Sequence, residues 1–171
     1  FISGKRITAV SALFSNFTPT RDLMDGMMYA PGSKPGSEEV TINSEDAALV
    51  HFQFEDGVVG SVVLSEASAG RVNHLSIEVT GQKQNVWWHS EENNRLNIGN
   101  KNQGVNTWVF PFSGGFRDTL RGLFATFYAD IERGYADENS IYPTLYDGMR
   151  NVLICNAIYE SATNSGKWIS I

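Results

Sequence analysis

Cysteine is nearly absent from this sequence, since Cys155 is the only one among 171 residues. A single cysteine cannot form an intrachain disulfide, which excludes a secreted scaffold held by disulfides and favours a reducing, cytoplasmic setting. Long apolar runs are also missing, because no stretch approaches the roughly 18 apolar residues of a membrane-spanning helix. No basic and then apolar leader opens the chain, so we expect neither a membrane span nor export.

Positive charge is scarce as well. The chain has 13 Lys and Arg against 19 Asp and Glu, for a formal net charge of −6. The basic residues are scattered and form no stripe for phosphates, so we expect no nucleic-acid partner. Hydrophobic residues make up 42% of the chain and include ten Phe, six Tyr and four Trp. This composition and length predict one folded domain over residues 1–171.

Phosphate-binding and metal-binding signatures are missing too. No Gly-x-Gly-x-x-Gly follows a strand and no P-loop is present, so we expect no cofactor bound by this chain. The three histidines, His51, His74 and His89, lie on different predicted strands without ligand spacing to Cys155. They are interpreted as structural or solvated residues, and no metal site is predicted. The acidic residues that flank the strands are interpreted as solvated loop charges: Glu38, Glu39, Asp46, Glu91 and Glu92.

What is present is a strand-like alternation over the first two thirds of the chain. Residues 6–14 are apolar on both sides, which predicts a strand covered on both faces. Residues 15–37 contain three Pro and three Gly and predict a long irregular loop, followed by a short strand at 40–42. Residues 47–54 and 58–64 predict a hairpin around the Asp56-Gly57 turn. Further strands are predicted at 72–80, 85–89, 95–98 and 105–110.

Helical spacing begins after Ser113-Gly114-Gly115. Apolar residues at 116, 120, 123, 124, 127 and 131 predict a helix that lies on the sheet. A second helix is predicted to start near Thr144, whose spacing to Asp147 matches a capping box, and to end at Gly166, with more than one side buried. Residues 167–171 predict a last strand returning to the sheet edge. The fold class is therefore α+β, an open-faced, predominantly antiparallel sheet with helices packed on one face.

Adjacent tryptophans at Trp87 and Trp88 fall on one predicted strand and must point to opposite faces of the sheet. One of them can enter the core. The other is available for a subunit contact or as a stacking platform for a sugar, and we favour the subunit contact.

Several segments, taken in order, resemble the C-terminal domain of the Gfo/Idh/MocA oxidoreductase family. They carry the family's succession of strand, acidic-Gly turn, strand, Gly-Arg-x-Asn loop, strand, Gly turn, and closing helix with terminal strand: residues 44–61, 65–74, 77–81, 142–150 and 157–168. The resemblance implies an N-terminal Rossmann domain that is absent from this chain. The family's Glu-Lys-Pro motif and Asp-x-Gly-x-His-x-x-Asp helix, which supply the catalytic lysine and histidine, are also absent from it, so we expect no catalytic residue here.

The resemblance further implies hydride transfer between NAD or NADP and a carbinol carbon of a sugar, cyclitol or related polyol. This domain would shape the substrate pocket and form a homo-oligomer through its open sheet face. The candidate substrate-binding residues are Arg21, Arg71 and Asn73, because Arg and Asn supply directed hydrogen bonds to hydroxyl or phosphate oxygens. For each of these three residues, the alternative interpretation is a surface or turn residue that contacts no substrate.

Two further readings stay open. A self-standing carbohydrate-binding or assembly module would use Trp87 without catalysis. An inactive regulatory homologue would keep the fold but lack the catalytic lysine.

Overall fold

A computed structural model describes residues 2–25, 34–71, 73–112, 114–137 and 140–171. The chain divides into two compact units, each of which is described by itself. The first unit comprises Phe1–Ala69 and Met149–Ile171, and the second comprises Gly70–Gly148.

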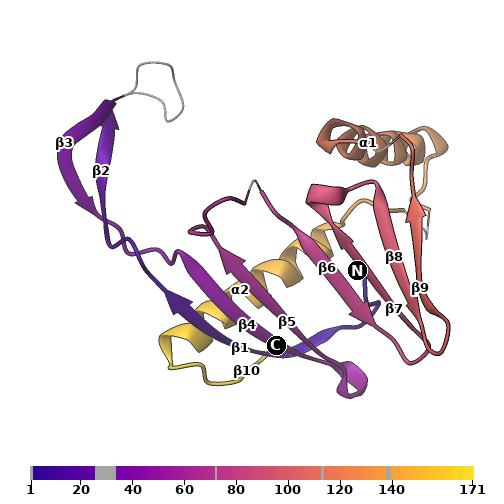
Figure 1. Cartoon of the computed structure of the whole chain (residues 1–171), viewed down its shortest axis with the longest axis horizontal. Coiled ribbons are helices and arrows are strands. Elements are labelled where there is room, and N and C mark those ends of the chain that lie inside the picture. Colours follow the sequence, from indigo (N-terminus) through magenta and orange to yellow (C-terminus); the bar gives the residue numbers. More distant parts are fainter. Residues whose placement is uncertain (1, 26–33, 72, 113, 138–139) are drawn as a thin grey trace. The chain divides into compact units, whose positions relative to one another are not determined.

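Antiparallel strands and two long helices make up the fold (Figure 1). The strands are β1 (Ile7–Ser15), β2 (Thr20–Asp25), β3 (Lys34–Thr41), β4 (Ala47–Phe54), β5 (Val59–Ser65), β6 (Ser76–Thr80), β7 (Gln84–His89), β8 (Arg95–Asn100), β9 (Gly104–Val109) and β10 (Ile169–Ser170). The helices are α1 (Phe116–Arg133) and α2 (Leu145–Thr163), with short 3-10 turns η1 (Glu55–Gly57) and η2 (Ser90–Glu92). The predicted α+β class with antiparallel strands is confirmed, although the strands are divided among three sheets.

The first unit contains a four-stranded sheet in the order β10-β1-β4-β5. Alternation along β4 places Ala48 and Val50 on the face that α2 covers, where they pack with Ala12 of β1. The outer shell of this core is Phe14, Phe52, Ile158 and Ala162. The predicted pattern of β4 is confirmed, because its alternate residues are buried while Leu49 and His51 are exposed.

A tight hairpin joins β4 to β5, as the sequence predicts. Asp56 and Gly57 both take positive φ, at 59° and 75°. Gly adopts this left-handed conformation without steric cost, and Asp tolerates it better than most residues.

The C-terminal strand closes the sheet edge, which confirms the expected return of residues 167–171. β10 pairs antiparallel with β1, through Ala9 opposite Ser170 and Val10 opposite Ile169. Beyond the end of β10, the amide N–H of Ala12 donates to the hydroxyl of fully buried Ser161 at 2.8 Å. That hydroxyl donates in turn to the carbonyl of Lys167 at 2.6 Å, so one side chain of α2 ties two backbone segments together.

The prediction of an irregular loop over residues 15–37 is wrong at both ends. β2 and β3 form a two-stranded ribbon in which Arg21 lies opposite Val40 and Asp22 opposite Glu39. Pro19 lies just before β2, so its missing N–H removes no bond from the centre of the ladder. The middle of the predicted loop, residues 26–33, lies outside the described residues.

The second unit contains a four-stranded meander in the order β6-β7-β8-β9. Ile77 lies opposite Trp88 and Glu78 opposite Trp87, so the two tryptophans occupy opposite faces, as predicted. β6 begins at Ser76 and not at residue 72, because residues before it belong to a loop held by side-chain bonds described below.

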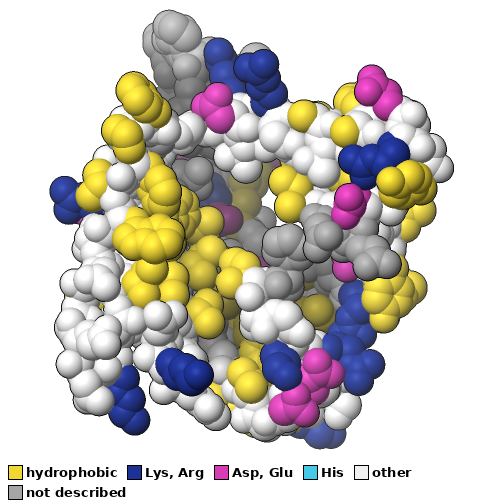
Figure 2. Space-filling view, turned by 90° about the vertical axis from the view of Figure 1, so that its right-hand side faces the viewer, with side chains coloured by type: hydrophobic (Ala, Val, Ile, Leu, Met, Phe, Trp, Pro, Cys, Tyr) yellow, Lys and Arg dark blue, Asp and Glu magenta, His cyan; other side chains and the backbone are white. Residues whose placement is uncertain are grey.

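The apolar face predicted for α1 is present but poorly covered. Phe124 is 53% exposed and Ile131 is 58% exposed, so the expected close packing of this helix on the sheet is not observed. α2 begins after Thr144, whose hydroxyl and backbone N–H both contact the Asp147 carboxylate, and this confirms the predicted capping box. Only the side of α2 that carries Ala157 and Ser161 is buried, which corrects the expectation that more than one side is buried. Figure 2 shows apolar side chains that reach the surface.

Neither described helix is apolar over a length sufficient to span a lipid bilayer.

Candidate functional site

Arg21 is held by a buried carboxylate. Its Nη2 donates to Asp46 Oδ1 at 2.6 Å, and the Asp46 side chain is only 2% exposed. The other carboxylate oxygen accepts hydrogen bonds from the backbone N–H groups of Phe17 and Thr18 at 2.6 and 2.7 Å, and from the Thr18 hydroxyl at 2.9 Å. Asp46 therefore organises the connection between β1 and β2 and fixes one edge of the guanidinium.

These contacts hold the pKa of Asp46 below its usual range, chiefly through the Thr18 backbone N–H, and the effect exceeds that of desolvation. The interpretation of Asp46 as a solvated charge is therefore wrong. That interpretation failed because the partners of this carboxylate lie more than twenty residues earlier in the chain. These partners are Phe17, Thr18 and Arg21. A hollow of about 350 Å³ opens beside this cluster and is lined by Thr18, Thr20, Arg21, Asp22 and Glu39.

Arg71 and Asn73 lie together on the loop that precedes β6. Arg71 Nη1 donates to Glu91 Oε2 of η2 at 2.6 Å. Ser90 fastens the backbone of the same loop, because its hydroxyl accepts from Leu75 N–H at 2.8 Å and its own N–H donates to the Leu75 carbonyl at 2.8 Å. Asn73 takes a positive φ of 53°, a conformation that Asn tolerates better than most residues.

His74 adds a third polar side chain to this loop. Its Nδ1 lies 3.0 Å from the same Glu91 oxygen that Arg71 contacts. Partial desolvation would raise the pKa of Glu91, but the His74 and Arg71 contacts outweigh it and the pKa lies below its usual value. The His74 ring stacks on that of His89, with ring centroids 6.0 Å apart. The His89 Nδ1 is buried without a hydrogen-bond partner in the described part of the chain.

The structure thus brings two of the three predicted site residues together. Arg71 and Asn73 share one loop of the second unit, whereas Arg21 belongs to the first unit. Sequence reasoning missed Glu91 and His74, which were interpreted as a solvated charge and as a structural or solvated histidine. A usable signal existed, since His74 directly follows the Gly-Arg-x-Asn segment, but its carboxylate partner lies 17 positions later on another element.

A second buried carboxylate stabilises the loop after α1. Asp130, 5% exposed, accepts hydrogen bonds from the hydroxyls of Ser140 and Tyr142 and from the Asp137 N–H, and it pairs with Arg133 at 2.9 Å. The Ser140 hydroxyl and then the Tyr142 hydroxyl contribute most to a pKa of about 2 for Asp130. Its contacts are all internal, so we assign it a structural role.

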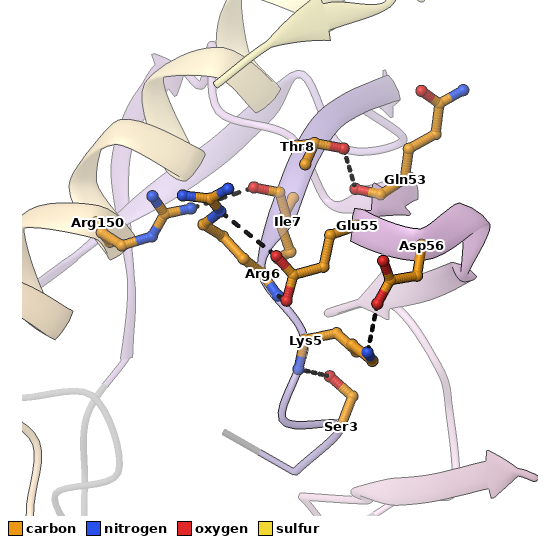
Figure 3. A network of polar contacts seen from close by, with 9 residues as sticks. All are labelled: Ser3, Lys5, Arg6, Ile7, Thr8, Gln53, Glu55, Asp56 and Arg150. Carbon is orange, nitrogen blue, oxygen red and sulfur yellow. Dashed lines mark hydrogen bonds and ion pairs between the residues drawn. The ribbon is translucent and has the colours of Figure 1, made fainter.

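A polar network fixes the start of β1 in the first unit (Figure 3). Lys5 Nζ donates to Asp56 at 2.6 Å, the Arg6 N–H donates to Glu55 at 3.2 Å, and Arg150 of α2 donates to the Ile7 carbonyl at 3.1 Å. These contacts join the N-terminal segment, residues 5–7, to the η1 turn and to α2.

The described residues do not suit a dinucleotide phosphate. Every strand pair is antiparallel, and the N-terminus of each helix already carries a carboxylate of its own. Asp118 accepts the Gly115 N–H at 2.8 Å at the start of α1, and Asp147 occupies the equivalent place on α2. A phosphate bound there would be repelled by these charges. Within the same described residues, no three His, Cys, Asp or Glu side chains are grouped as a metal site would require.

Comparison with known proteins assigns this fold and these loops to a family. Residues 17–171 match the Gfo/Idh/MocA group, described as "Oxidoreductase family, C-terminal alpha/beta domain". The match covers more than half of the chain, so this chain belongs to that family, which confirms the resemblance.

Levoglucosan dehydrogenase of Pseudarthrobacter phenanthrenivorans is 25% identical over 185 residues, covering 96% of this chain and 46% of that protein. The structure of levoglucosan dehydrogenase in complex with NADH and L-sorbose matches with a TM-score of 0.79 at 22% identity, covering 97% of this chain and 45% of that one. An oxidoreductase domain protein from Kribbella flavida matches with a TM-score of 0.82 at 21% identity, covering 99% and 47%. The chain therefore spans less than half the length of these relatives, and the structural likeness concerns the fold.

Proposed function

We propose that this chain is the substrate-binding and oligomerisation domain of a cytoplasmic, NAD(P)-dependent oxidoreductase that acts on a sugar, cyclitol or related polyol. The family match over residues 17–171 supports an oxidoreductase and reaches into both compact units, which supports treating residues 1–171 as one domain. The name of the curated relative and its complex with NADH and L-sorbose support a sugar substrate and a nicotinamide cofactor.

The observation that carries the proposal is the pairing of each candidate arginine with a carboxylate. Arg21 is fixed by Asp46 and Arg71 by Glu91, both at 2.6 Å. A guanidinium oriented in this way keeps further N–H donors for hydroxyl oxygens, while its charge is balanced. Such groups can bind a neutral, hydroxyl-rich molecule in a defined orientation, and Asn73 lies two positions after Arg71 on the same loop.

The capped N-termini of the two helices indicate where the cofactor is not bound. Because Asp118 and Asp147 already cap α1 and α2, we place the cofactor outside these 171 residues. The family resemblance implies the same place for the catalytic lysine and histidine, whose motifs this chain lacks. No reaction step is assigned to residues of this chain. Its role is to bind and orient the substrate. A self-standing carbohydrate module is the weaker reading, because the matched family domain is that of oxidoreductases.

We propose a second copy of this chain as the partner of the uncovered face of the β10-β1-β4-β5 sheet. α2 covers the other face, while Leu13, Leu49 and Val63 form one cross-strand row that is 54%, 46% and 72% exposed. A contiguous apolar row of this kind on a monomer is typical of a protein interface. A two-fold pairing of sheets would bury the row against itself.

Two measurements test the proposed function. Calorimetric titration of NADH and NADPH into the 171-residue chain should show no saturable binding, and tight binding would contradict the placement of the cofactor. The complete protein that carries this chain should form NADH or NADPH when it is supplied with levoglucosan, L-sorbose or a cyclitol. Failure with all of these substrates and with both cofactors would refute a sugar or polyol oxidoreductase.

A further inference from the structure

Glu91 is shared by two side chains of the loop before β6. Its Oε2 receives Arg71 Nη1 at 2.6 Å and lies 3.0 Å from His74 Nδ1. Glu91 is about one third exposed and His74 about one quarter exposed, so the pair is only partly desolvated and remains accessible from solvent. One carboxylate oxygen thus fixes the direction of both residues.

The contact with Glu91 decides which ring nitrogen of His74 carries the proton. A carboxylate only accepts hydrogen bonds, so in the neutral imidazole we expect the proton on Nδ1, 3.0 Å from Glu91, and the lone pair on Nε2. The carboxylate-histidine arrangement of metal and catalytic sites uses the same effect to fix a tautomer. Among the residues that the structure describes, none is hydrogen bonded to His74 Nε2. The stacked ring of His89 limits rotation from one side.

The backbone on either side of His74 is also held by hydrogen bonds. The two hydrogen bonds between Ser90 and Leu75, both 2.8 Å, join the residue after His74 to η2. The Ser90 hydroxyl also contacts the Asn73 carbonyl at 3.4 Å. The loop therefore holds the Arg71 guanidinium and the His74 ring at the same Glu91 oxygen, which places the Nε2 acceptor of His74 near the Arg71 donors.

We propose that His74 is a substrate-contacting residue whose Nε2 accepts a hydrogen bond from a hydroxyl of the substrate, and that Glu91 is the positioning residue that makes it an acceptor. This inference rests on the proposed function and narrows its substrate class. A hydroxyl group both donates and accepts, so a pair of neighbouring sugar hydroxyls matches the acceptor and donors of this loop. The ligand is therefore a sugar or polyol that presents a free hydroxyl to His74.

Steady-state kinetics of the complete protein with levoglucosan as the probe test this role. His74→Leu should raise KM for the sugar about tenfold, the effect of losing one good hydrogen bond, while kcat and KM for the nicotinamide cofactor stay unchanged. His74→Gln, whose amide oxygen can replace the acceptor, should restore KM to within about threefold. Glu92→Gln is the matched control, because Glu92 lies in the same turn and only approaches exposed Arg95 at 3.9 Å.

A spectroscopic measurement keeps the proposal testable if a variant folds poorly. Imidazole ¹⁵N spectra of the 171-residue chain at neutral pH should show His74 protonated on Nδ1, and Glu91→Gln should shift the proton toward Nε2. A wild-type chain protonated on Nε2, or an unchanged KM in His74→Leu, would overturn the inference while leaving the proposed function intact. A complete protein that oxidises no sugar would overturn both.

Discussion

Replacing Ser161 with Ala should destabilise the first unit strongly, although the change removes a single oxygen atom. The Ser161 hydroxyl is fully buried and bridges two backbone groups: it accepts from Ala12 N–H at 2.8 Å and donates to the Lys167 carbonyl at 2.6 Å. The alanine variant leaves the Ala12 N–H without this partner in a buried position, where Ala12 is only 1% exposed, and removes a hydrogen bond from the carbonyl of Lys167, an exposed residue.

The expected loss follows from these two groups. An unsatisfied buried donor costs about 1–3 kcal/mol and the lost hydrogen bond to the Lys167 carbonyl about 1 kcal/mol more, so Ser161→Ala should lower the free energy of unfolding by about 2–4 kcal/mol. Whole domains are stable by only about 5–15 kcal/mol, so this loss is large enough for equilibrium urea unfolding to resolve clearly.

Thr163→Ala is the matched control. Thr163 lies one half turn further along α2, and its hydroxyl donates to helix carbonyls of Tyr159 and Glu160 at an exposed position. Its loss should change the unfolding free energy by less than about 0.5 kcal/mol. Hydrogen exchange should locate the Ser161 effect, because the Ala12 amide loses its acceptor. A Ser161→Ala chain as stable as Thr163→Ala, with Ala12 still protected, would refute the reasoning.

Two other predictions concern acid stability and assembly. The pKa of Asp130, about 2, lies below the ordinary value of 3.8, so its stabilising contribution is complete above pH 4 and is lost as the pH falls towards 2. The midpoint temperature of thermal unfolding should therefore fall less steeply with decreasing pH for Asp130→Asn than for the wild type. Equal slopes of midpoint temperature against pH would contradict this role of Asp130. Leu49→Glu places a charge on the uncovered sheet face and should shift sedimentation profiles to monomer, whereas Asn156→Glu on exposed α2 should not. A wild-type chain that is monomeric at high concentration would refute the sheet-face interface.

Much of the fold could be predicted because it depends on local pattern. β4 occupies the predicted residues 47–54, the Asp56-Gly57 turn has the required positive φ, and Thr144 caps α2 through Asp147. Each of these features depends on residues within a few positions of one another, where alternation, turn chemistry and capping chemistry act directly.

The features that were missed depend on distant contacts or on uncovered surfaces. The β2–β3 ribbon pairs residues that are between 9 and 21 positions apart, from Asp25 with Lys34 to Thr20 with Thr41, and its proline and glycine content suggested a loop. The second side of α2 and the apolar face of α1 were expected to be buried, because periodicity shows that a face is apolar but not what covers it.

The candidate site shows the same limit. Arg21, Arg71 and Asn73 were chosen for their residue type and loop position, whereas Asp46 and Glu91, which orient the arginines, were interpreted as solvated acids. Each carboxylate acquires its role only when the fold brings it to within 2.6 Å of an arginine some twenty positions away. Residue type and loop position therefore suggest which side chains are able to contact a ligand, but they do not reveal which carboxylates orient those side chains.

We propose that these 171 residues contact the substrate while the cofactor is bound elsewhere. The kinetics of Arg71→Met in the complete protein test this claim most directly, because the variant keeps the length of the side chain and removes its charged donors. We predict a KM for the sugar raised about 10- to 100-fold, the effect of a charge-assisted hydrogen bond, with an unchanged KM for NAD or NADP. An unchanged KM for the sugar, or a raised KM for the cofactor, would contradict the account.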